Sequence, residues 1–249
     1  MSMDLLRLAR RLERAQALQN DRFNHASGGA SLPLGGGFAH FRGAAHPLNQ
    51  ALGLTEPVDE AGLLAVEAFL GAPTVLELSP AADPGLWPLL AARGYRLQMF
   101  QQLWIRDLDP PLAVPDADIR PTRDGDIYTR VVAAGFQERD DWAGLDPAWG
   151  APLGLPDAWA FLASVDGEPA GGGMLGLVEG VALLSGASVL PRFRGRGLQK
   201  ALIAARLAFA RDRGCDIACA STAPGTASQR SYEACGFRVA YPKVEMARG

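Results

Sequence analysis

The residues best suited to chemistry form a short basic, glycine-rich segment in the second half of the chain. Three arginines and two glycines fall within six positions: Arg192, Arg194, Gly195, Arg196 and Gly197. An apolar strand is expected to end just before this segment and a helix to begin just after it. The first turn of a helix presents unpaired N–H groups and partial positive charge, and glycines let a phosphate approach the backbone. The segment therefore predicts a binding site for a phosphate-bearing ligand.

Two familiar nucleotide-binding patterns do not fit this segment. A P-loop needs Gly-Lys followed by Ser or Thr at the start of the helix, but Gly197 is followed by Leu198 and Gln199. A dinucleotide fingerprint needs a third glycine at position 200, which is Lys200. The helix itself is well supported, because one apolar stripe repeats at helical spacing: Leu198, Ala201, Leu202, Ala205 and Phe209.

The pattern Arg192-Phe-Arg-Gly195-Arg-Gly197 is similar to the pyrophosphate loop of the GNAT superfamily of acyl-CoA-dependent N-acetyltransferases. A downstream segment agrees, because Ser228, Tyr232 and Gly236-Phe237 resemble the fourth-helix signature of that superfamily. The resemblance covers roughly residues 116–244 and is sharpest over 188–237. An asparagine that is frequent before this helix is absent, and the aligned positions are Gly225 and Ser228.

The resemblance implies that acetyl-CoA is the cosubstrate and assigns a role to each matching residue. The backbone of Val189 and Leu190 would pair with the pantetheine arm, and the N–H groups from Arg194 to Gln199 would enclose the pyrophosphate. The cofactor-binding candidates are Val189, Leu190, Arg192, Arg194, Gly195, Arg196, Gly197, Leu198, Gln199 and Ser228. Tyr232 would face the thioester sulfur as the catalytic acid, because a phenol with a pKa of about 10 can protonate a leaving thiolate. For the loop, the alternative is a purely structural helix start whose arginines are solvated. For Tyr232, the alternative is a tyrosine that only packs in the core.

The implied reaction is transfer of an acetyl group to a primary amine by direct attack in a ternary complex. The acceptor would be a small-molecule or peptide amine. The expected strand over 181–190 carries no carboxylate to act as a base, and Glu179 at the preceding turn is a weak candidate. The acidic, aromatic segment from Glu138 to Trp142, with Trp149, would suit a cationic acceptor or would be a solvated loop. Because an obvious base is missing, a non-catalytic acyl-CoA-binding sensor is the alternative function.

Composition narrows the choice of partners. The chain has 249 residues, 48% of them hydrophobic and 20% charged, which is typical of a globular protein. A net charge of −3 argues against nucleic acid and anionic membranes as partners, and no apolar run is long enough to span a bilayer. Residues 3–19 predict an amphipathic helix and not a targeting signal. The three cysteines lack metal-ligand spacing, so they predict buried free thiols and no metal site, and such thiols are typical of a cytoplasmic protein. A homodimer is compatible with the sequence.

The chain also repeats itself at a constant offset of 142 residues. Residues 92–97 resemble 234–239, Gly53 aligns with Gly195, and the strand ending at Ser79 aligns with the one ending at Ser221. The expected helices over 56–70 and 198–213 keep the same offset. Two unrelated domains that share a Gly-aromatic helix ending are the alternative. A proline-rich linker over 107–116 leads us to expect a degenerate GNAT-like domain over 1–110 and an acetyltransferase domain over 116–249.

The first copy lacks the phosphate loop. Gly53 is kept, but Gly197 is matched by Thr55, and nearby acidic residues would repel a pyrophosphate. This copy would shape the acceptor cleft or complete a shared sheet, and its His40 and His46 are expected on the strand that matches 181–190.

The second copy predicts short strands and helices in alternation. The strands are expected at 119–122, 158–165, 169–178, 181–190, 216–221 and from 237, and the helices at 124–136, 198–213 and 227–234. Asp166-Gly167 predicts a hairpin turn. The fold class is therefore α/β (α+β): tandem GNAT-like units, each a mixed, mostly antiparallel sheet flanked by helices, with a splayed strand pair at the acyl-CoA site.

Overall fold

The computed structural model describes residues 3–44, 46–113, 115–122, 124–142 and 155–249, and it divides into two compact units. Unit 1 comprises Met1–Leu103, Ser221–Pro224 and Val239–Gly249. Unit 2 comprises Trp104–Ala220 and Gly225–Arg238. These units differ from the expected ranges 1–110 and 116–249, because the last strand of the chain packs with the first unit. No described helix is both long enough and apolar enough to cross a bilayer.

Unit 1 is a sheet with helices on both faces. In chain order its elements are α1 (Met3–Ala26), β1 (Ala30–Leu34), β2 (Gly37–Phe41), β3 (Gln50–Leu52), α2 (Glu60–Leu70), β4 (Thr74–Leu78), α3 (Leu86–Ala92), the first part of β5 (Arg96–Asp107) and β11 (Arg238–Arg248). Strands β1, β2 and β3 pair antiparallel, β3 pairs parallel with β4, and β4 pairs antiparallel with β11. Phe41 meets Phe69 of α2, whereas the backbone at Gly53 approaches Ala17 of α1.

Helix α2 begins later than its sequence suggests. The sequence predicts a start near Glu56, but the helix starts at Glu60 because the Asp59 carboxylate caps it, accepting from the Gly62 N–H at 2.8 Å. The histidines are also placed differently from the expectation. His40 lies on β2 and His46 lies between β2 and β3, whereas the strand that corresponds to β9 by order is β3.

Unit 2 carries the predicted phosphate loop. Its elements are β6 (Asp118–Thr122), α4 (Gly125–Phe136), β7 (Ala158–Val165), β8 (Glu168–Val178), β9 (Val181–Val189), a 3-10 turn (Pro191–Phe193), α5 (Leu198–Arg211), β10 (Ile217–Thr222) and α6 (Ala227–Ala234). Strands β6 to β9 pair antiparallel in chain order, and β9 pairs parallel with β10. The hairpin turn at Asp166-Gly167 is confirmed, since both residues have positive φ.

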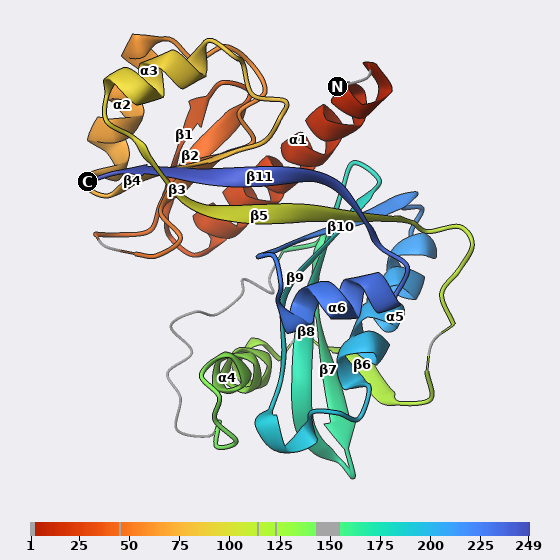
Figure 1. Ribbon diagram of the computed structural model, residues 1–249. Helices are drawn as coiled ribbons and strands as arrows, with labels where there is room; N and C mark the ends of the chain where they lie inside the picture. The colour runs from red at the N-terminus through yellow and green to blue at the C-terminus, as the bar shows by residue number, and fades with distance from the viewer. Residues whose placement is uncertain (1–2, 45, 114, 123, 143–154) are drawn as a thin grey trace. The chain divides into compact units, whose positions relative to one another are not determined.

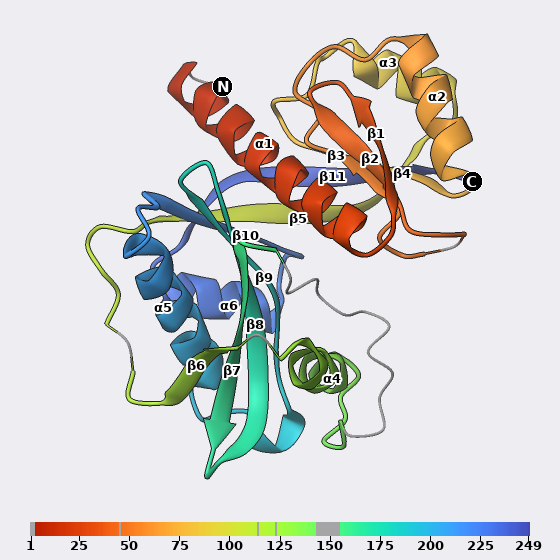
Figure 2. The same cartoon turned by 180° about the vertical axis from the view of Figure 1, so that it is seen from behind.

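Two adjacent glycines show that helices cover both faces of the unit 2 sheet. A Cβ added at Gly172 would lie 3.0 Å from Tyr128 and Val132 of α4. A Cβ added at Gly173 would lie 2.8 Å from the Arg206 guanidinium of α5. Successive residues of a strand point to opposite faces, so α4 and α5 pack on opposite sides of β8 (Figures 1 and 2). Both helices come close to the strand because these positions have no side chain.

The internal repeat extends to the order of the elements. The run β1, β2, β3, α2, β4, α3, β5 in the first copy has the same order as β7, β8, β9, α5, β10, α6, β11 in the second. The final strands are exchanged between the copies: β11 lies beside β4, and β5 lies beside β10. The predicted fold class, a mixed and mostly antiparallel arrangement of strands flanked by helices, is therefore confirmed.

Candidate functional site

The phosphate loop connects β9 to α5 through two glycines with left-handed backbone angles. Gly195 has φ 77° and Gly197, which caps α5, has φ 79°. A Cβ added at either position would meet no atom within 4 Å, so these glycines are needed for the backbone conformation and not for packing. No side chain caps α5, and its first intrahelical bond is donated by Ala201 to Gly197 at 3.0 Å. The N–H groups of Leu198 to Lys200 precede that bond and are available to an anion.

An open groove of about 590 Å³ lies at this helix end. Strand β9 contributes Ala187 to Val189, and the segment after α4 contributes Glu138. The loop and the first turn of α5 form another wall, and α6 contributes Ala227, Ser228 and Ser231. Seven of the predicted cofactor-binding residues line this groove together: Val189, Arg194, Gly195, Gly197, Leu198, Gln199 and Ser228.

Arg194 uses its side chain to hold the loop in place. Its Nε donates to the Val189 carbonyl at 3.0 Å, its Nη2 donates to the Gly135 carbonyl at 2.8 Å, and its Nη1 pairs with Glu138. Each partner lies on the wall of the groove. Arg194 therefore ties the end of β9, the end of α4 and the loop into one rim.

Arg192 and Arg196 do not line the groove. Their guanidinium groups lie over the ring of Phe193, 4.9 and 5.5 Å from its centroid, and Arg192 also pairs with Glu168. The backbone N–H of Arg192 donates to Asp140 at 2.8 Å. Direct contact of these two arginines with a phosphate stays a prediction.

Leu190 also lies outside the groove. Its side chain is fully buried, and its N–H donates to the Ala170 carbonyl at 2.9 Å. Pairing of Leu190 with pantetheine stays a prediction, whereas Val189 is on the groove wall.

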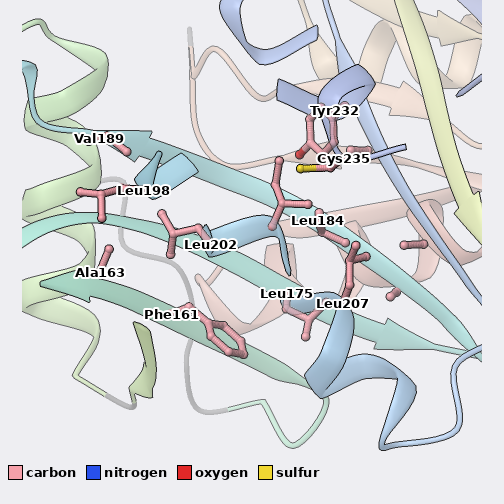
Figure 3. Close-up of a cluster of buried hydrophobic side chains, with 14 of the residues drawn as sticks. Phe161, Ala163, Leu175, Leu184, Val189, Leu198, Leu202, Leu207, Tyr232 and Cys235 are labelled. Atoms are coloured by element: carbon pink, nitrogen blue, oxygen red, sulfur yellow. The ribbon is translucent and has the colours of Figure 1, made fainter. Parts of the chain in front are cut away.

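Tyr232 is buried in the apolar core of unit 2, with 4% of its surface exposed, and it does not line the groove. Its ring meets Phe237 edge-on at 4.9 Å, and Figure 3 shows it beside Cys235 and away from Val189 and Leu198. Burial raises the pKa of the Tyr232 hydroxyl, while the charge of Arg206 opposes that rise. The phenol is therefore protonated at neutral pH, as a proton donor must be.

Strand β9 has an irregularity where the groove begins. Gly172 pairs with Ser188 and Met174 with Ser185, so one residue of β8 faces two residues of β9, Gly186 and Ala187. Gly186 has φ 51°, and its carbonyl accepts from the Tyr128 hydroxyl at 2.6 Å. Such a β-bulge redirects the residues that follow it, and in this protein those residues line the groove.

The strands β9 and β10 separate before this bulge. Their paired residues run from Val181 with Ile217 to Leu183 with Cys219, although β9 continues to Val189 and β10 to Thr222. The backbone of β9 beyond Leu183 therefore has no partner on β10 within the described part of the chain. This agrees with the predicted splayed strand pair.

Several residues that line the groove are not among the cofactor-binding residues predicted from the sequence. Lys200 adds a cation at the helix start, Ser231 adds a hydroxyl on α6, and the end of α4 adds Gly135. A Cβ at Gly135 would lie 2.4 Å from the Ser188 hydroxyl, so a glycine there allows α4 to approach β9. Lys200 could have been found from its position in the first turn of α5, whereas Gly135 gives no local signal.

The segment expected to receive the acceptor contacts the phosphate loop, and its role toward an acceptor stays a prediction. Glu138 pairs with Arg194, Asp140 accepts from Arg192, and Trp142 packs against the core of unit 2. Trp149 lies outside the described residues. Glu179 occupies the β8–β9 turn with φ 49°. The three cysteines are buried free thiols, as predicted.

Comparisons with known proteins agree with this geometry. Residues 126–237 match the family model described as the Acetyltransferase (GNAT) family. A GCN5-related N-acetyltransferase from Kribbella flavida is similar in structure, with a TM-score of 0.69 and 20% identity over 96% of this chain and 95% of that one. A tandem GNAT protein from the clavulanic acid biosynthesis pathway has a TM-score of 0.60 and 18% identity over 88% and 78%. An acetyltransferase from the GNAT family of Colwellia psychrerythraea has a TM-score of 0.53 and 16% identity over 80% and 77%.

At these identities the similar structures establish the fold, and they include a tandem protein as the repeat predicts. A comparison with curated proteins found no match.

Proposed function

Residues 126–237 form a GNAT acetyltransferase domain, and on that premise we propose that the protein transfers an acetyl group from acetyl-CoA to a primary amine. The observation that carries the proposal is the groove at the start of α5. Uncapped N–H groups, left-handed Gly195 and Gly197, and the Lys200 cation converge there on one open space. A diphosphate has the charge and the acceptor oxygens that such a helix terminus binds.

The groove suits the rest of the cosubstrate as well. Its wall continues from the helix terminus along Val189, Ser188 and Ala187, where β9 has separated from β10. An extended pantetheine arm with two amide groups can pair with such an open strand edge. Ser228 and Ser231 on the facing wall supply hydroxyl groups.

The proposed reaction is a direct attack within a ternary complex. Holding the amine and the thioester in one site supplies about 7–11 kcal/mol of the barrier through orientation. The neutral amine attacks the carbonyl carbon, and the thiolate leaves as Tyr232 donates its proton. The acceptor class is a small-molecule or peptide amine. A base is not assigned, because β9 carries no carboxylate and Glu138, which lines the groove, is paired with Arg194.

The experiment couples two measurements on the full chain. Calorimetry with acetyl-CoA measures binding, and release of free CoA thiol across a panel of amines measures turnover. Tyr232→Phe should leave the Kd unchanged and lower kcat about 100-fold or more, the usual contribution of a general acid. Tyr95→Phe, at a buried tyrosine of unit 1 that does not line the groove, is the matched control and should leave kcat unchanged.

Each outcome has a definite meaning. A folded protein that ignores acetyl-CoA would contradict the proposal entirely. Tight binding without turnover of any amine would favour the sensor function. Unchanged turnover in Tyr232→Phe would remove the proposed acid and leave the acetyltransferase activity in place.

A further inference from the structure

The β-bulge of β9, at Gly186 and Ala187, is contacted by a buried tyrosine of α4. The Tyr128 side chain is buried, and its hydroxyl donates to the Gly186 carbonyl at 2.6 Å. A Cβ added at Gly186 would lie 2.7 Å from that same hydroxyl oxygen. A glycine is therefore needed at this position both for its left-handed φ of 51° and for the close approach of the tyrosine.

Arg206, a buried arginine of α5, reaches the same bulge from the other face of the sheet. Its Nη1 donates to the Met174 carbonyl at 2.8 Å and to the Ser185 carbonyl at 3.4 Å. These two residues are the strand pair that borders the bulge. Gly173 lies opposite the bulged residues, and a Cβ added there would lie 2.8 Å from the Arg206 Cζ. Because α4 and α5 pack on opposite sides of β8, polar side chains hold the bulge from both faces.

Packing alone does not explain a charged group at this place. Arg206 has no exposed surface, and no carboxylate pairs with it among the described residues. Its Nε also donates to a backbone carbonyl, that of Leu202 at 2.9 Å. Taking a guanidinium out of water is costly, and apolar residues of similar volume often give equal or greater stability. A buried cation that bonds only to backbone carbonyls can instead favour one local conformation of that backbone.

The contacts from α4 fix the direction of the strand segment that lines the groove. The peptide bond between Gly186 and Ala187 is trans, so its N–H points away from its C=O. Holding the Gly186 carbonyl on Tyr128 therefore also fixes the direction of the Ala187 N–H, and Ala187 is the first residue of β9 on the groove wall. The next residue, Ser188, donates from its hydroxyl to the Val132 carbonyl of α4 at 2.8 Å. Ala187 thus lies between two residues that α4 holds.

We propose that Tyr128 and Arg206 are positioning residues that hold the β9 bulge, so that Ala187 to Val189 can pair with the pantetheine arm of acetyl-CoA. The inference rests on the proposed function. Neither side chain lines the groove, so each acts through the backbone of β9. In the proposed binding mode the diphosphate lies at the start of α5 and the bulge lies at the acyl end of the cosubstrate. Loss of either contact should therefore affect the pantetheine arm and the thioester and leave the diphosphate contacts intact.

The test separates the two parts of the cosubstrate. Calorimetry measures the Kd of acetyl-CoA and the Kd of 3′-phosphorylated ADP, the part of CoA that lacks pantetheine. Each variant is also measured for thermal unfolding and for kcat with an amine that the wild type acetylates. Tyr128→Phe removes only the hydroxyl that bonds to the bulge. Thr129→Val is the matched control, because it removes a buried hydroxyl with no hydrogen-bond partner in the described chain from the next position of α4.

Tyr128→Phe should weaken acetyl-CoA binding about tenfold, because the Gly186 carbonyl loses its buried donor. The Kd of 3′-phosphorylated ADP should stay unchanged. At saturating acetyl-CoA, kcat should also fall about tenfold, since the thioester is less well oriented. Thr129→Val should match the wild type in every measurement.

Two further substitutions test the clamp from the other contacts. Arg206→Lys keeps the charge without the planar fork and should show the same pattern as Tyr128→Phe. If Arg206→Lys does not fold, Gly173→Ala, which displaces the guanidinium, takes its place. Gly186→Ala should weaken acetyl-CoA binding by itself. Combined with Tyr128→Phe it should lose less than the product of the two single losses, because the missing hydroxyl leaves room for the new Cβ.

Equal weakening of acetyl-CoA and 3′-phosphorylated ADP would mean that the two side chains only support the fold, and would overturn the inference. Wild-type Kd and kcat in either Tyr128→Phe or the Arg206 variant would overturn it as well, without touching the proposed function. Wild-type protein that binds no acetyl-CoA would overturn both.

Discussion

Arg194 donates from its Nε to the carbonyl oxygen of Val189, at 3.0 Å, and so folds back on the strand from which its own loop emerges. The same guanidinium reaches the Gly135 carbonyl and the Glu138 carboxylate, 59 and 56 residues away in sequence. An arginine in a phosphate loop is expected to contact phosphate, but the N–H groups of this side chain donate to groups of the protein itself. Its geometry suits a clamp that shapes the groove.

If Arg194 is a clamp, a change to lysine should be nearly as harmful as a change to alanine. Lysine keeps the positive charge but cannot reproduce the fork that reaches Val189 and Gly135 together. We expect both variants to weaken acetyl-CoA binding about tenfold, which corresponds to about 1.4 kcal/mol. Calorimetry measures this, with Arg211→Lys on exposed helix surface as the control. Wild-type affinity in Arg194→Lys would show that charge alone is required.

Gly197 should matter for its backbone angle. Gly197→Ala places a Cβ in open space but in a left-handed conformation that costs about 1–2 kcal/mol. If the backbone relaxes out of this conformation, the first N–H groups of α5 would no longer point into the groove. Acetyl-CoA binding should then weaken about tenfold or more. Gly214, with φ 80° and nothing within 4 Å, lies just beyond the other end of α5 and provides a control of equal strain. Equal loss of binding in Gly214→Ala would point to general destabilisation.

Unit 1 contains a buried ion cluster that should dominate its stability. The Lys243 ammonium lies 3.1 Å from Glu13 and donates to Glu77, and the Tyr241 hydroxyl donates to Glu13 at 2.8 Å. All three charged side chains are buried. Lys243→Met would leave two carboxylates buried without a cation and should cost about 3–5 kcal/mol of unfolding free energy. Denaturant unfolding measures this.

Neutralising the carboxylates should reverse part of that loss. Combining Lys243→Met with Glu13→Gln and Glu77→Gln removes the uncompensated charge, so the triple variant should be more stable than Lys243→Met alone. The exposed Lys200→Met should change stability by no more than about 0.5 kcal/mol. If the single Lys243→Met variant unfolds like the wild type, the cluster contributes nothing.

His40 should make unit 1 sensitive to acid. Burial lowers the pKa of His40 to about 4, with Asp21 opposing the shift, and the side chain is 2% exposed. Because the folded pKa lies below the unfolded value of about 6.5, the unfolded chain binds a proton first as the pH falls. Stability should therefore be intact above pH 6.5 and decline toward pH 4, by up to about 3 kcal/mol from this residue.

The comparison for His40 is the pH profile of His40→Gln. The difference in unfolding free energy between wild type and variant should be constant above pH 7 and shrink between pH 6.5 and 4. Profiles that stay parallel across this range would show that His40 is not buried as a neutral group.

Local sequence was sufficient for much of this protein. The Gly-Arg loop, the start of α5 at Leu198, the Asp166-Gly167 hairpin and the offset between the two copies could all be predicted, because each depends on neighbours within a few residues. Backbone angles open to glycine, helix capping and alternation of apolar residues act over that range. The family resemblance depended on the same short segments.

Only the tertiary structure decided how distant parts of the chain meet. An arginine in a helix gives no sign of burial, yet Arg206 is fully buried and donates to backbone carbonyls of β8 and β9. Likewise, Val244 pairs with Leu78, so the last strand completes the first unit. Strand partners and the surroundings of a buried charge depend on the packing of residues far apart in sequence, and no local pattern encodes that packing.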